Sequence, residues 1–185
     1  MKILFPNALL NEIGAEILKT ARAPEYIIPT IALPVAFYSL FGVALQQGVE
    51  SATYLLATFG VFAVMGPSIF GFGAGVATER ELGILGLKRA MPAPGMVYIL
   101  AKLVTTLIFA SIALGLIYAV AGFAAGVTLP RATWALLLAT HLLAVVPFIL
   151  IGLTIGFTFN ASGAVAIANL LFLGLSACGG LWIPV

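Results

Sequence analysis

Charged residues divide this chain into long apolar stretches. Residues 26–49, 51–78, 103–130 and 132–185 contain no Asp, Glu, Lys or Arg. A bilayer core about 30 Å thick needs about 20 apolar helical residues, so each of the first three stretches has room for one membrane span. The last stretch has room for two, divided by the polar residues at 160–163. These apolar runs are too long and too uniform for the alternating strands of a membrane β-barrel. The pattern therefore predicts an all-α, polytopic membrane bundle with five spans, at about 27–46, 54–77, 97–123, 133–156 and 163–182.

The residues before the first span have the pattern of an amphipathic helix, predicted over about 7–23. Leucines and isoleucines occupy one side of this helix. The other side carries Glu12, Glu16, Lys19 and Arg22. Asn7 is expected to cap the start of the helix, and Pro24 to end it. Such a helix lies in the membrane interface with its apolar face towards the lipid. It serves either as an anchor for the first span or as a docking element for a partner.

A second polar segment, residues 78–95, separates the second and third predicted spans. It contains Glu79, Arg80, Glu81, Lys88 and Arg89. Thr78 is expected to cap a short helix that has the two acids in its first turn. Pro92 and Pro94 are expected to end that helix. One hypothesis is a loop whose basic residues set the topology. Topology does not require the two acids, however, and their presence favours specific contacts.

Composition narrows the class of protein. Only 8% of the 185 residues are charged and 63% are hydrophobic, which excludes a soluble enzyme, a disordered tail and a disulfide scaffold. The net charge of +2 gives no indication of nucleic-acid binding. Arg131 is the one basic residue that falls in a loop of the opposite parity to the other seven. Because basic residues favour the cytoplasmic side, we expect an integral protein of a bacterial-type plasma (inner) membrane with a cytoplasmic N-terminus.

The predicted spans contain little catalytic chemistry. His141 is the only ionisable residue well inside a span, and it either forms a hydrogen bond within the packed helices or lines a substrate path. With no second ligand nearby and one cysteine, Cys178, we expect neither a metal site nor a cofactor. No phosphate-binding loop of the Gly-x4-Gly-Lys-Ser/Thr type is present, so we expect no ATPase activity in this chain. Glycines four residues apart, such as Gly152 and Gly156, indicate close helix packing, within the chain or across a dimer.

Several of these motifs occur together in one family. An amphipathic helix is followed by Pro-Glu-Tyr at 24–26, a second span, Glu-Arg-Glu-x-Gly at 79–83, Pro92, and a span that opens with Tyr98 and Lys102. This order resembles the permeases of the ABC-2 type, the membrane subunits of type-2 ABC transporters, most of which are exporters. The resemblance covers nearly the whole chain. Ile84 departs from it, because the family commonly has threonine after the motif glycine.

The resemblance implies roles for the two polar segments. The N-terminal helix, with Glu12, Glu16, Lys19 and Arg22, corresponds to the family's interface helix. The 79–92 segment corresponds to the coupling helix that docks in a groove of a separate ATPase subunit. Its implied coupling residues are Glu79, Arg80, Glu81, Gly83, Lys88 and Arg89. Two ATPase copies and a second permease, identical or different, are the implied partners, together with the lipid bilayer.

Two further expectations follow. The family has six spans and this sequence shows five, so we expect the chain to be a fragment or truncated form that lacks the last span. A natural five-span protein is the alternative. The alternatives to an ABC permease are an ATP-independent secondary carrier and a structural membrane subunit. A carrier usually couples to ions through carboxylates in its spans, and no Asp or Glu lies in a predicted span. A structural subunit has no need of the two cytoplasmic segments.

Overall fold

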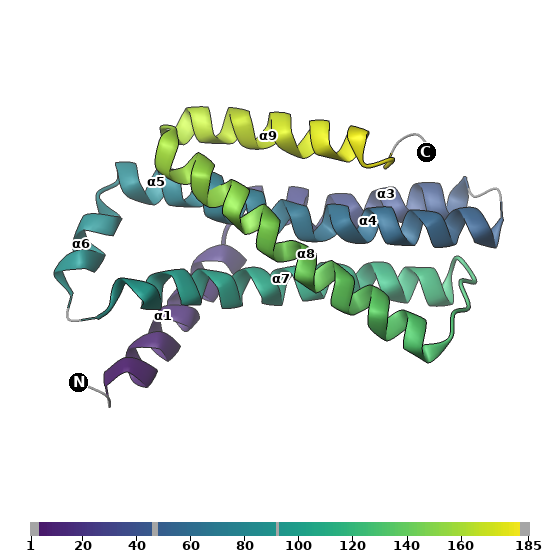
Figure 1. Ribbon diagram of the computed structural model, residues 1–185, viewed down its shortest axis with the longest axis horizontal. Coiled ribbons are helices and arrows are strands. Elements are labelled where there is room, and N and C mark those ends of the chain that lie inside the picture. The colour runs from purple at the N-terminus through teal and green to yellow at the C-terminus, as the bar shows by residue number, and fades with distance from the viewer. Residues whose placement is uncertain (1–3, 46–47, 92, 182–185) are drawn as a thin grey trace.

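A computed structural model of the protein describes residues 4–45, 48–91 and 93–181, and this part of the chain is helical throughout, with short connections. Symbols η1 to η3 denote π-helical turns. The elements in chain order are α1 (Leu4–Ala21), α2 (Pro24–Ile27), η1 (Ile28–Ala32), α3 (Leu33–Ser39), η2 (Leu40–Ala44), α4 (Val49–Ile69), η3 (Phe70–Ala74), α5 (Gly75–Glu81), α6 (Ile84–Ala90), α7 (Gly95–Phe123), α8 (Arg131–Thr158) and α9 (Ala161–Cys178). Figure 1 shows α1 and α6 at one end of the bundle and the α7–α8 connection at the other.

In the described part of the chain, four helices are long and apolar enough to cross a membrane: Val49–Glu81, Gly95–Phe123, Arg131–Thr158 and Ala161–Cys178. The last three begin and end within a few residues of the expected spans. Trp182, the expected end of the last span, lies outside the described residues. Asn160 caps α9, with its side-chain oxygen accepting a hydrogen bond from the Gly163 N–H at 2.8 Å. The polar break in the last uncharged stretch is therefore a helix boundary.

The first expected span differs from the other four. Its described apolar helix, Ile28–Ala44, is shorter than the expected 27–46 and alternates between α and π turns. Gln46, at the expected end, lies outside the described residues. Pro29 and Pro34 cannot donate a backbone hydrogen bond, which loosens the regular α-helical ladder. The hydroxyl of Thr30 donates to the Tyr26 carbonyl at 2.6 Å, a bond that threonine makes within helices.

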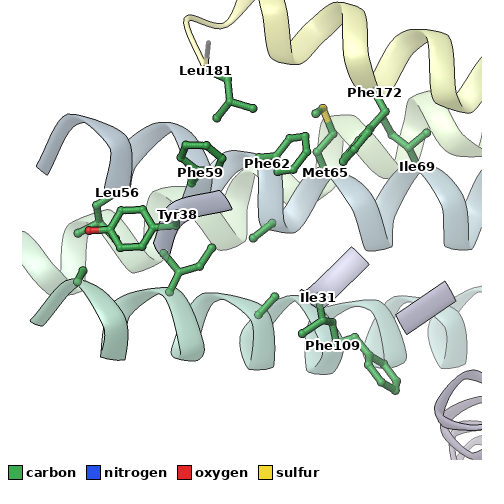
Figure 2. Close-up of a cluster of buried hydrophobic side chains, with 14 of the residues drawn as sticks. Ile31, Tyr38, Leu56, Phe59, Phe62, Met65, Ile69, Phe109, Phe172 and Leu181 are labelled. Carbon is green, nitrogen blue, oxygen red and sulfur yellow. The ribbon is translucent and has the colours of Figure 1, made fainter. Parts of the chain in front are cut away.

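The helix 49–81 forms the centre of the bundle. It is the most buried of the four long helices, and it packs against α3, α7, α8 and α9. Figure 2 shows its aromatic side chains gathered with Phe172 of α9. The rings of Phe62 and Phe172 have centroids 4.4 Å apart. A Cβ atom at Gly156 of α8 would lie 2.5 Å from the Phe72 carbonyl oxygen, so this glycine allows α8 to approach the central helix closely.

The two polar segments differ from expectation at their boundaries. α1 begins at Leu4, so Asn7 lies inside the helix and does not cap it. Thr78, Glu79 and Glu81 do not start a helix, because they form the last turns of the helix 49–81. The Thr78 hydroxyl donates to the Ala74 carbonyl four residues earlier, a bond that threonine also makes within helices.

A left-handed glycine separates this long helix from α6. Gly83 has φ 73°, a conformation that glycine adopts without steric cost, and α6 starts at the next residue. α6 ends at Ala90, and Pro94 flanks the start of α7. Pro92, expected to help end the short helix, lies outside the described residues.

Candidate functional site

Four charged side chains from three helices meet at the α1 end of the bundle. We call Glu16 and Lys19 of α1, Glu79 of α5 and Lys102 of α7 the ion cluster. The Lys102 ammonium lies 2.6 Å from a Glu16 carboxylate oxygen and 3.0 Å from one of Glu79. Lys19 lies 2.7 Å from Glu16 and also pairs with Glu79. Two carboxylates thus share two ammonium groups, and the cluster has no net charge.

Burial makes the cluster's internal pairing essential. Lys102 is only 3% exposed, and Glu16 and Glu79 are also buried. A buried charge is tolerated only when it is paired and hydrogen-bonded. Glu79 also accepts a hydrogen bond from the Tyr98 hydroxyl. At the C-terminal end of its helix Glu79 is disfavoured by the helix dipole, so the two lysines account for its ionised state there.

Lys19 forms the outer edge of the cluster, with its side chain 50% exposed. Partial burial alone would lower the pKa of Lys19. The attraction of Glu79 and the hydrogen bonds to Glu16 and Glu79 outweigh burial, and the pKa of Lys19 lies above its ordinary value. Lys19 is therefore held in its charged form by the two acids.

A second ion pair joins α6 to α1. Lys88, in the last turn of α6, pairs with Glu12 of α1. The same ammonium lies 4.6 Å from the centroid of the Tyr98 ring, within cation–π range. α6 is thereby connected both to the N-terminal helix and to the start of α7.

Arg80 and Glu81 contact the α8–α9 turn. The Arg80 guanidinium donates to the carbonyl oxygens of Phe157 and Phe159, the latter at 2.6 Å. The Glu81 carboxylate accepts from the Ala161 N–H at 2.9 Å. A cation thus lies at the C-terminus of α8 and an anion at the N-terminus of α9, as the helix dipoles favour. The adjacent charges of the Glu-Arg-Glu motif therefore face different parts of the chain.

Three implied site residues lie outside these contacts. Arg22 and Arg89 are exposed, and Gly83 serves as the turn between α5 and α6. The structure adds two residues to the site, Tyr98 and Lys102, which the sequence analysis noted only as the opening of the third span. Their spacing of four residues places them on one face of α7, and this spacing was the available signal.

His141 lies in a separate buried site between α4, α7 and α8. Its Nε2 atom lies 3.0 Å from the Ala57 carbonyl oxygen, and its Nδ1 atom 2.7 Å from the Tyr118 hydroxyl. A carbonyl only accepts, so Nε2 carries the proton and the neutral ring accepts the Tyr118 hydrogen at Nδ1. A Cβ atom at Gly60 would lie 2.2 Å from His141 Cε1, so the ring packs directly against this glycine. Both ring nitrogens are engaged within the chain, and a role for His141 in a substrate path stays a prediction.

Within residues 4–45, 48–91 and 93–181, no group of three or more His, Cys, Asp or Glu side chains is placed to hold a metal ion. The contacts of the ion cluster include pairs between helices. It links the N-terminal helix, the end of the central helix and the start of α7, and the Lys88–Glu12 pair extends this link to α6.

Comparison with known proteins identifies the family of this chain. Residues 12–185 match the family model described as ABC-2 type transporter. The chain is 25% identical over 182 residues to a Bacillus subtilis (strain 168) protein named "Putative transport permease YvfS", covering 96% of this chain and 74% of that relative. No solved structure matches the chain. The family resemblance carried by the two polar segments is confirmed, and the protein is an integral membrane protein that belongs to the ABC-2 type transporter family.

Proposed function

We propose that this transport permease is the membrane subunit of an ATP-driven exporter, energised by a separate ATPase. Two ATPase copies and a second permease copy complete the transporter, which lies in a bacterial-type plasma (inner) membrane with the N-terminus of this chain in the cytoplasm. Family membership and the name of the Bacillus subtilis relative support a role in transport. The placement of most basic residues at the end that carries α1 and α6 supports the orientation.

The observation that carries the coupling proposal is the arrangement of ion pairs around α6. This helix is joined to α1 by Lys88–Glu12, and it follows Glu79 by only a short turn. Glu79 in turn binds Lys102 of α7 and Lys19 of α1. A displacement of α6 would therefore be transmitted to three helices at once, which is the requirement for a rigid-body change between inward- and outward-open forms.

The face available to an ATPase differs from the acidic pair. Glu79 and Glu81 both form contacts inside the chain. Glu81 is exposed but its carboxylate is engaged by the Ala161 N–H. The other large exposed side chains here include Leu87, which is 70% exposed, Leu82 and Arg89. Exposed leucines together with a basic residue are common at protein interfaces. We propose that Leu82, Leu87 and Arg89 form the docking face, while Glu79, Arg80, Glu81, Lys88 and Gly83 hold that face in position.

The test is copurification of the full chain with coexpressed candidate ABC ATPases, followed by measurement of ATP hydrolysis. Leu87→Asp and Arg89→Glu are expected to lower both the amount of bound ATPase and the stimulation of hydrolysis at least tenfold, because hot-spot residues dominate binding energy. Arg131→Glu is the matched control, since it reverses an arginine at the start of α8, at the opposite end of the bundle. Wild-type binding and stimulation in both α6 variants would contradict the docking face. No bound ATPase and no stimulated hydrolysis with the wild-type chain would contradict the coupling proposal and favour the carrier or structural alternatives.

A further inference from the structure

The first half of α9, residues 161–169, forms one wall of a cavity. This cavity of about 610 Å³ lies beside the ion cluster, and we call it the inner cavity. Val165 and Asn169 line it from α9. Both side chains are exposed and lie one helical turn apart, so this face of α9 borders the cavity without filling it. The other walls come from α1, α2, η1, η3, α5, α6 and α7.

The second half of α9 is firmly attached to the central helix. The rings of Phe172 and Phe62 have centroids 4.4 Å apart, and Figure 2 shows the two side chains side by side. Just after the helix, the Gly180 carbonyl accepts a hydrogen bond from the Tyr54 hydroxyl at 3.0 Å. Packed aromatic side chains resist small displacements. This half of α9 is therefore fixed to α4.

The first half of α9 packs through smaller side chains. Its buried residues are Ala164 and Ala168. An alanine side chain is a single methyl group, so it makes far fewer dispersion contacts than a buried ring such as Phe172. The apolar packing of this half is therefore weaker, and its position depends more on other interactions.

Arg80 and Glu81 supply such interactions. Glu81 accepts a hydrogen bond from the backbone N–H of Ala161, the first residue of α9. Arg80 donates to two carbonyl oxygens at the end of α8. We call these three hydrogen bonds the bracket. Both residues belong to the last turn of α5, and α6 begins shortly afterwards, beyond the turn at Gly83. The bracket thus connects α6 to the start of α9 through polar contacts.

We propose that Arg80 and Glu81 are positioning residues that make the first half of α9 follow α6. A displacement of α6 moves the last turn of α5, and the bracket carries the start of α9 with it. Val165 and Asn169 then change the width of the inner cavity, while Phe172 keeps the second half in place. The holding of α9 by the bracket concerns this chain alone. Its movement by an ATPase rests on the proposed function.

The first test needs no ATPase and measures distances between two spin labels by pulsed electron paramagnetic resonance. The full chain carries Cys178→Ser, which removes the native thiol, and labelled cysteines in place of Ile112 of α7 and Ala166 of α9, both exposed. It is placed in nanodiscs and diluted with unlabelled chain, so that only distances within one chain are measured. Arg80→Ala and Glu81→Ala should each broaden the distance distribution about twofold, because a helix end released from its hydrogen bonds samples more positions.

Matched controls separate this local release from a general loosening. A label at Leu173, in the second half of α9, replaces the one at Ala166 and should report little change. Glu81→Gln keeps an oxygen that can accept the Ala161 N–H, so it should retain the wild-type distribution. Arg131→Ala removes an exposed arginine at the other end of α8 and should also have no effect. Unchanged distributions at Ala166 in both bracket variants, or equal broadening at both α9 positions, would overturn the proposal.

The second test adds a copurified ATPase and a non-hydrolysable ATP analogue. In the wild type and in Glu81→Gln, the distance from Ile112 to Ala166 should shift to a new maximum. In Arg80→Ala complexes that retain the ATPase, this shift should be lost. A shift of wild-type size in those complexes, or no shift in a wild-type complex, would overturn the proposal. A wild-type chain that binds no ATPase would instead contradict the proposed function, and the first test would then decide whether the bracket holds α9.

Discussion

Two buried polar sites in this bundle connect helices in different ways. The ion cluster joins α1, α5 and α7 at one end through four long charged side chains. The His141 site joins α4, α7 and α8 inside the bundle through one neutral ring and two hydrogen bonds. In the first site the contacts are made by the ends of long, flexible side chains, whereas in the second the ring packs directly against Gly60.

This difference indicates which contacts can adjust when helices move. A lysine has four rotatable side-chain bonds, and its ammonium keeps a carboxylate partner over a range of helix positions. A ring held between a carbonyl, a hydroxyl and a glycine has no such range, because packed interiors resist small displacements. We therefore expect the ion cluster to act as a movable joint, and the His141 site to hold α4 and α8 together as a unit.

The largest expected effect is the loss of Lys102. Lys102→Met leaves Glu16 and Glu79 with only Lys19 to share, so one buried carboxylate is uncompensated. Breaking a buried ion pair in this way costs about 3–5 kcal/mol. The free energy of unfolding is measured by titrating SDS into mixed micelles and following helical circular dichroism.

The second substitution Glu79→Gln is the control for this prediction. Added to Lys102→Met, it removes the uncompensated charge and should restore about half of the lost stability or more. A Lys102→Met protein within 1 kcal/mol of the wild type would contradict the account of the cluster as a closed set of charges. In that case the contrast between the ion cluster and the His141 site would not hold, because the cluster would be no more than a solvated group of side chains.

The next effect tests the close packing of the His141 site. Gly60→Ala places a Cβ atom where His141 Cε1 lies, so the ring must move and its bond to the Ala57 carbonyl must lengthen. Overpacking of this kind costs about 1–3 kcal/mol. In a His141→Ala background the same Gly60→Ala change should cost almost nothing, because the clash is absent. The double-mutant cycle, measured by the same unfolding assay, gives this coupling directly.

Gly115→Ala is the matched control. Gly115 lies within α7, and an added Cβ atom would have no neighbour within 4 Å. This change should leave stability the same or raise it by about 0.5–1 kcal/mol, because alanine is the better helix former. Additive effects of Gly60→Ala and His141→Ala would show that the ring can shift freely, and would remove the distinction between the two sites.

The sequence predicted the long helices because the length of an apolar run between charged residues is a property of one segment and needs no partner from elsewhere in the chain. Gaps between charged residues locate α7, α8 and α9 closely, and Asn160 marks the break between the last two. The first span was predicted less well, because the π turns at η1 and η2 depend on how Pro29 and Pro34 are accommodated by neighbouring helices. Thr78 was misassigned because a threonine hydroxyl accepts bonds at a helix start but donates to a carbonyl within a helix.

The site was only partly predictable for a related reason. Sequence reasoning singled out Glu16, Lys19 and Glu79, but nothing in the sequence pairs Glu16 with Lys102, which lies 86 residues away. Such partners are set by the packing of α1 on α7. The family resemblance implies a coupling role for the acidic pair, and that role stays a prediction. What the sequence does not show is that Glu79 lies in the ion cluster and that Glu81 contacts the start of α9.

The smallest expected effect concerns Lys19 at the exposed edge of the cluster. Its pKa is raised in the folded protein, so its contribution to stability is fully present below its ordinary value of 10.5 and is lost as the pH rises through the folded value. Arginine stays charged over this range, so Lys19→Arg is the reference. The stability of the wild type relative to Lys19→Arg should be constant below about pH 10 and should fall above it. Because Lys19 is half exposed, solvent screening limits the fall to less than about 1 kcal/mol. SDS unfolding of both proteins at several pH values measures this difference. Groups that titrate in both proteins contribute equally to the two free energies of unfolding, so their contributions cancel. A difference that stays constant to pH 12 would show that Lys19 is not coupled to the buried acids, and would confine the movable joint to Lys102.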